Sequence, residues 1–164
     1  MKPSSRVAII GATLLATASL ASADNVVLSK YSAHLTQSGV NIPTGFTSVG
    51  TVQFPKGVKK RVLEVNVSVV ETTNVATAIG IIVYANGIRM EPVSPSAGYV
   101  TDNCTVANQN CNVSGYFWLD IDTAELANPG LFVGVPITID LRAAKNGGTT
   151  VIGVATIDAH MNRK

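Results

Sequence analysis

Three carboxylates close together in the sequence are the first candidates for chemistry. Asp120, Asp122 and Glu125 form a D-x-D-x-x-E run, and hard oxygen ligands at such a spacing suit Ca²⁺. The run lacks the glycine and the further oxygen ligands of an EF-hand loop. Asp122 instead stands where a helix N-cap would, and Glu125 follows three residues later, as in a capping box. The sequence therefore favours a short capped helix over "DTAELANPG", and no metal is predicted.

The residues of nucleophilic catalysis are sparse. The chain has two histidines, His34 and His160, and no G-x-S-x-G elbow. The histidines would meet only if the first and last strands pair, and neither has a nucleophile or an orienting acid supplied locally. Each histidine lies in an expected strand with a period-two pattern, and a histidine on the solvent-facing side of such a strand is ordinary. We therefore expect a protein that is not an enzyme and uses no cofactor.

An aromatic pair followed by acids marks the segment "GYFWLDID". Strand alternation would send Phe117 and Leu119 to the core and would place Tyr116, Trp118 and Asp120 on the opposite face. An aromatic platform beside acids suits a sugar, a cationic group or a protein partner. The alternative is that Trp118, the single tryptophan of the chain, is covered by a loop or buried between layers. This covered arrangement is favoured, because a lone tryptophan is usually packed.

Four basic residues gather before the strongest predicted strand, in "FPKGVKKRVLEV". They are Lys56, Lys59, Lys60 and Arg61. Such a cluster could meet an anionic polysaccharide, a lipid or nucleic acid, whereas its ordinary role is that of a solvated loop that discourages edge pairing. No aromatic residue interleaves the cluster to stack bases. The solvated loop is therefore favoured, and no nucleic-acid partner is expected.

The two cysteines, Cys104 and Cys111, are separated by the polar hexapeptide "TVANQN". Their spacing matches neither a C-x-x-C redox motif nor a zinc knuckle. In an exported protein such a pair predicts one disulfide. Closing so small a ring contributes about 2.5 kcal/mol in the loop-entropy model. We expect the bridge to hold a polar surface loop.

The N-terminus predicts export. Lys2 and Arg6 precede an uncharged apolar run, and "ASA" at 21–23 places small residues where a signal peptidase reads. The run, of about 15 residues, is shorter than the roughly 20 that span a bilayer, although an uncleaved anchor is the alternative. We expect residues 1–23 to be a signal peptide and 24–164 one domain without a membrane span. The expected location is secreted, periplasmic or at the cell surface.

Cleavage would also remove the formal excess of positive charge. Lys2 and Arg6 leave with the signal peptide, so twelve basic residues become ten against ten acidic ones. A neutral chain has no long-range field that steers it to nucleic acid. Low charge combined with a high apolar content favours association between copies.

Alternation with a period of two predicts the fold class. In "RVLEVNVSVVETT", Val65 and Val67 share one face, and Asn66 and Ser68 the other. The sequences "NVVLSKYSAHLT" and "TSVGTVQF" are weaker strand candidates, while "EPVSPSAG" and the cysteine segment are expected to be loop.

Two glycine-containing turns complete this prediction. Asn86-Gly87 predicts a hairpin, and Asn146-Gly147-Gly148 is expected to form a second one. About eight strands and one short helix then predict a single antiparallel β-sandwich of Greek-key or jelly-roll style, with a small β-barrel as the alternative.

Two functional hypotheses follow. The first is an exported, non-enzymatic structural or assembly subunit of a surface, matrix or filament, which binds itself or another extracellular protein. For it, segment 24–36 would supply an edge strand to its own sheet or to a neighbouring copy. The second is a secreted, monomeric binding module that recognises a sugar, such as a polysaccharide, or a protein partner through the aromatic stripe.

Overall fold

The computed structural model describes residues 30–35, 40–93 and 100–163, so the predicted signal peptide lies outside the described residues. These residues contain eleven strands and one helix, α1 (Ile121–Ala127). Eight strands have five residues or more: β1 (Lys30–Leu35), β3 (Thr47–Phe54), β4 (Arg61–Thr73), β5 (Thr77–Ala85), β8 (Val100–Cys104), β9 (Asn110–Asp120), β10 (Ile137–Lys145) and β11 (Thr150–Arg163). Three have two residues each: β2 (Val40–Asn41), β6 (Ile88–Arg89) and β7 (Glu91–Pro92).

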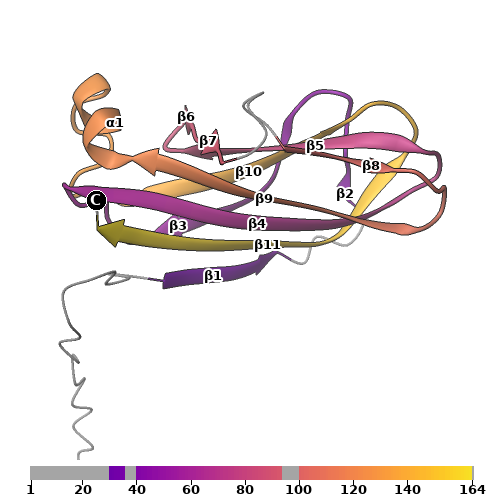
Figure 1. Cartoon of the computed structure of the whole chain (residues 1–164), viewed down its shortest axis with the longest axis horizontal. Helices are drawn as coiled ribbons and strands as arrows, with labels where there is room; N and C mark the ends of the chain where they lie inside the picture. The colour runs from indigo at the N-terminus through magenta and orange to yellow at the C-terminus, as the bar shows by residue number, and fades with distance from the viewer. Residues whose placement is uncertain (1–29, 36–39, 94–99, 164) are drawn as a thin grey trace, which may run out of the picture.

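Two antiparallel sheets form the two layers of the molecule (Figure 1). The β4 sheet has the order β1-β11-β4-β9-β7, with β2 also paired to β11. The β5 sheet has the order β3-β10-β5-β6, with β8 also paired to β5. Along the eight longer strands the chain changes sheet at every step except that from β5 to β8, and the resulting order is that of a jelly roll. The predicted sandwich is confirmed, and the barrel alternative is wrong because the two sheets remain separate.

The core lies between the sheets and follows the alternation of β4. Val65 and Val67 are fully buried, whereas Asn66 is exposed and Ser68 is half-buried, as predicted. Ile81 of β5 belongs to the same buried cluster on the other side of the sandwich. Apolar side chains that leave water in this way supply the main favourable term in folding.

The two glycine-containing turns have different outcomes. Asn86 and Gly87 have φ angles of 46° and 81°, and they join β5 to β6 in the predicted hairpin. Residues 146–149 join β10 to β11, but β10 pairs within the β5 sheet and β11 within the β4 sheet. The prediction of a second hairpin is therefore wrong. The glycines reverse the chain, while the burial of each strand in its own layer decides its partners.

The segment around the cysteines, which was expected to be loop, is mostly strand. β8 pairs with β5, and β9 pairs with β4 along its length. Residues 105–109 form the connection between them. The loop prediction is wrong here because the polar residues of β9 lie on the outer face of a sheet, where polar side chains are compatible with a strand.

β1 occupies an edge of the β4 sheet, where it pairs antiparallel with β11 of the same chain. Of the two arrangements expected for segment 24–36, the structure therefore has the intramolecular one over residues 30–35. The two histidines lie on these neighbouring strands but out of register: His34 is opposite Thr156, whereas His160 is opposite Lys30. Among the described residues, no helix has the length and apolar character needed to cross a membrane.

Candidate binding site

The aromatic pair of β9 lies on the outside of the sandwich. Trp118 is 41% exposed and Tyr116 is 38% exposed, while Phe117 between them is completely buried. The alternation predicted for this segment is thus confirmed, and the favoured covered arrangement of Trp118 is wrong. At Trp118 the neighbouring strand is the two-residue β7, which pairs with β9 at Glu91 and Pro92.

Polar side chains surround this pair on the adjacent strands. Antiparallel register aligns β7, β9, β4 and β11 in two rows that cross the outer surface of the β4 sheet. The first row is Glu91, Trp118, Glu64 and His160, and the second is Tyr116, Asn66 and Asp158. We call these residues the aromatic–acidic face. Three carboxylates and two aromatic rings therefore share one outer surface of the sheet.

Glu64 is the residue that orders the centre of this face. Its carboxylate accepts hydrogen bonds from the Tyr116 hydroxyl and from the Asn162 side-chain amide. Burial, together with this hydrogen bond and the negative charge of Glu64, raises the pKa of Tyr116 to about 12. Both donors are neutral, so the face keeps the negative charge of Glu64, and the Tyr116 ring is held in one orientation.

An apolar groove of about 310 Å³ opens beside Trp118, where the end of β9 meets α1. Leu119, Ala124 and Ala127 supply apolar walls, and Glu91 and Asp120 supply carboxylates. A planar indole beside a groove with oxygen acceptors can stack on the C–H face of a sugar ring while the acceptors bind its hydroxyls. The segment singled out in the sequence therefore lines a concave site.

Asp120 has a structural role in addition to its place in the groove. It is the N-cap of α1, and its Oδ1 accepts hydrogen bonds from the backbone N–H groups of Asp122, at 3.0 Å, and of Thr123, at 3.4 Å. The short helix is confirmed, but the predicted N-cap at Asp122 is wrong. β9 ends at Asp120, so the helix begins directly after it.

The other two carboxylates of the D-x-D-x-x-E run bind separate backbone segments. Asp122 accepts the N–H of Lys60 with both oxygens, at 3.0 and 3.1 Å. Glu125 accepts the N–H groups of Gly130, Phe132 and Val133 at 2.6, 2.8 and 3.0 Å, and these bonds lower its pKa. Glu125 is therefore not the second half of a capping box, because its carboxylate reaches forward to the loop after α1.

The basic cluster lies in the loop before β4. Lys56, Lys59 and Lys60 are exposed, and Arg61 at the start of the strand is half-buried. Lys59 borders a hollow that also contains Asp122 and Glu125 of α1, so acids lie beside the lysines. This setting fits the solvated loop favoured from the sequence. The cluster is not part of the aromatic–acidic face, and anion binding by it stays a prediction.

Cys104 and Cys111 form the predicted disulfide, with their Cα atoms 5.7 Å apart. Its place differs from the expected surface loop. Cys104 is buried at the end of β8 in one sheet, and Cys111 lies on β9 in the other, so the bridge ties the two layers where the chain crosses between them. The local spacing of the cysteines did not reveal this crossover.

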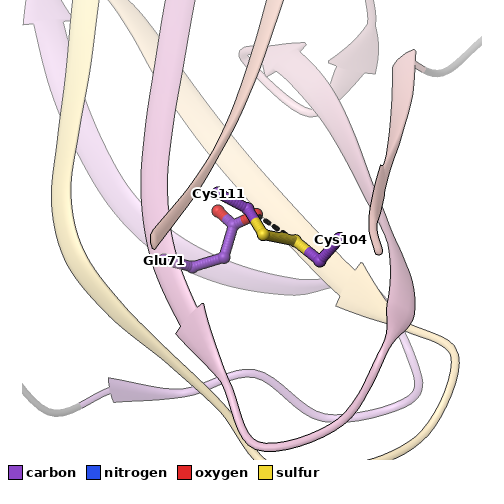
Figure 2. Close-up of side chains that lie close together, drawn as sticks. All are labelled: Glu71, Cys104 and Cys111. Carbon is purple, nitrogen blue, oxygen red and sulfur yellow. Dashed lines mark hydrogen bonds between the residues drawn. A yellow bond between two sulfur atoms is a disulfide. The ribbon is translucent and has the colours of Figure 1, made fainter. Parts of the chain in front are cut away.

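Sequence reasoning missed Glu71 of β4, which is 1% exposed and points at the disulfide in Figure 2. Its Oε1 lies 3.6 Å from Cys104 Sγ, and it is opposite Cys111 in the β4–β9 register. The alternation of β4 could have predicted this burial, because Glu71 follows Val65, Val67 and Val69 on the inward-facing side of the strand.

Comparisons with known proteins give no family. No protein-family model matches the chain, and no curated protein does. Among solved structures, dimeric latent PorU from Porphyromonas gingivalis is similar at a TM-score of 0.41 and 13% identity, over 84% of this chain. This chain spans 13% of the length of that one. The EclA C-terminal domain, described as a sugar-binding protein, is similar at 0.37 and 14% identity, over 80% of both chains. Neither likeness supports a functional assignment at these scores.

Proposed function

We propose that this protein is an exported, non-enzymatic binding module that recognises a neutral sugar polymer through the aromatic–acidic face. The exposed Trp118 beside the apolar groove is the observation that carries the proposal. A large, half-exposed indole with polar neighbours is typical of recognition sites, where aromatic residues contribute a disproportionate share of the binding energy.

The chemistry of the face favours a neutral sugar over an anionic one. The face contains the carboxylates of Glu64, Glu91 and Asp158, and its nearest basic residue along the rows is Lys30, which is opposite His160 at the β1 edge. Carboxylates accept hydrogen bonds from sugar hydroxyls and repel anions. The apolar walls of the groove suit the C–H surface of a pyranose ring, and the rows of polar side chains beside them could contact further units of a chain.

Trp118 also gives the test, because it is the single tryptophan and its fluorescence reports the site directly. We expect titration with neutral oligosaccharides from glucans, mannans and chitin to change this fluorescence for at least one series. Trp118→Ala should weaken binding to that ligand, measured by calorimetry, by roughly tenfold or more.

Phe46→Ala provides the matched control, because Phe46 is 40% exposed and borders a different hollow, with Gly80 and Lys145. This variant should bind as the wild type does. Equal loss in both variants, or no binding in any neutral series, would count against the proposal. Salt-sensitive binding of a lysine-rich peptide without sugar binding would point to a cationic protein partner instead.

An assembly subunit is the second candidate function. Within the part of the chain that the structure describes, β3 pairs with β10 on one side and with no strand on the other. Such an edge can accept a strand from another copy, and the predicted mature chain has no formal net charge to oppose association. Sedimentation of the mature protein over a wide concentration range tests this: large species support assembly, and a monomer throughout removes it.

A further inference from the structure

We infer that Glu71, Cys104 and Cys111 form a zinc site when the disulfide is reduced. One oxygen of Glu71 and the two cysteine sulfur atoms all lie within 4.8 Å of one another. Thiolates and a carboxylate are ligands that Zn²⁺ accepts, and three protein ligands with one open position for water make a common tetrahedral set. The site is separate from the aromatic–acidic face.

The positions of the three groups suit this set. With bonds of about 2.3 Å to sulfur and 2.0 Å to oxygen, tetrahedral ligand atoms lie about 3.5–3.8 Å apart. Glu71 Oε1 is already 3.6 Å from Cys104 Sγ, and Figure 2 shows its carboxylate turned toward both sulfur atoms. A zinc site therefore requires chiefly that the two sulfur atoms separate after the bond between them breaks.

The burial of Glu71 is a second argument. A carboxylate taken out of water is costly unless it is hydrogen-bonded, paired with a cation or bound to a metal. Glu71 is 1% exposed in an inward row that runs from Leu63 to Thr73, and its Oε1 lies 3.6 Å from Cys104 Sγ. With the bridge reduced, the same oxygen would face a thiol or a thiolate-bound metal, both of which it stabilises.

The strands supply a rigid frame for such a site. Glu71 and Cys111 are directly opposite each other on β4 and β9, and Cys104 is opposite Thr77 on β8 and β5. All three ligands thus come from paired strands, and the cluster joins the two sheets. Either a bound zinc ion or the disulfide would therefore link the two sheets where the chain crosses between them.

The reaction that exposes the ligands is a thiol–disulfide exchange. A small dithiol transfers two electrons and two protons to the Cys104–Cys111 bond, which breaks into two thiols, and the dithiol leaves as its own disulfide. Binding of Zn²⁺ then releases the two thiol protons to solvent.

The test uses the mature protein, reduced with a dithiol and then desalted without oxygen. We expect the reduced wild type to take up a single equivalent of Zn²⁺, and Co²⁺ in its place to give a thiolate-to-metal charge-transfer band. The oxidised protein and the Cys104→Ser/Cys111→Ser variant should give neither signal. Glu71→Gln should weaken Zn²⁺ binding at least about tenfold, whereas Glu125→Gln, in the α1 region, should not.

Failure of the reduced wild type to bind Zn²⁺, or equal affinity in Glu71→Gln, would overturn the inference. Circular dichroism accompanies the titration in case reduction unfolds the chain. In that event Zn²⁺ should restore the β spectrum of the wild type and not that of Glu71→Gln. An unfolded chain that Zn²⁺ does not restore would also overturn it. None of these readouts depends on sugar binding.

Discussion

Strand parity decides the environment of individual residues on β4, even against residue type. Val65, Val67 and Val69 face the core, and Glu71 follows them to a position that is 1% exposed. Glutamate is rarely buried so fully. On β9 alternation exposes a large aromatic residue instead: Trp118 lies on the outer face, and the smaller Val113 lies in the core.

Substitution of neighbouring residues on β4 tests this parity. Val67→Asp should prevent folding, because it places an unpaired charge between the sheets. Asn66→Asp, one position along, should change the free energy of unfolding by less than about 1 kcal/mol, since the side chain is exposed. Denaturant unfolding followed by circular dichroism measures both. Similar tolerance of the two substitutions would mean that the register is wrong.

At the scale of elements, the segment that follows β9 depends on carboxylate–backbone hydrogen bonds. Asp120 caps α1, Asp122 holds the loop before β4 through Lys60, and Glu125 holds the loop after the helix. A helix of seven residues is too short to be stable by itself. These anchors and the buried Ile121 and Ala124 therefore keep it beside the groove.

The pH dependence of stability should reveal the contribution of Glu125. Its folded-state pKa is lowered by hydrogen bonds from Gly130, Val133 and Phe132, so this contribution is complete above the ordinary glutamate pKa. It is lost as the pH falls through the lowered folded-state value. Glu125→Gln should accordingly reduce the unfolding midpoint at neutral pH, and the difference from the wild type should shrink in acid. A difference that stayed constant with pH would contradict the role assigned to this charge.

At the scale of the whole molecule, the chain repeatedly crosses between the layers. β4, β9 and β11 are neighbours in one sheet, although long stretches of sequence separate them. Closing such distant pairs costs loop entropy before any burial is gained. The Cys104–Cys111 bridge acts at one crossover, where it links β8 of one sheet to β9 of the other.

Intact mass spectrometry of the exported protein tests its processing and its bridge together. We expect the mass of residues 24–164 less two hydrogen atoms, because a signal peptidase removes the predicted leader and an oxidising compartment closes the bridge. Alkylation without reduction should add nothing. A mature chain with two alkylatable thiols would contradict the oxidised state, and retention of residues 1–23 would favour the membrane-anchor alternative.

The sequence by itself determined the patterns that depend on near neighbours. Alternation in "RVLEVNVSVVETT" assigned Val65 and Val67 to the core, and Asn86-Gly87 predicted a hairpin, because backbone geometry alone relates such residues. The tertiary structure decided which strands share a sheet, so that β10 and β11 separate despite their glycine-rich turn. It also decided that Trp118 is exposed and that Glu71 meets the disulfide. Those contacts join residues far apart in the sequence, and they form because apolar rows from distant strands exclude water together.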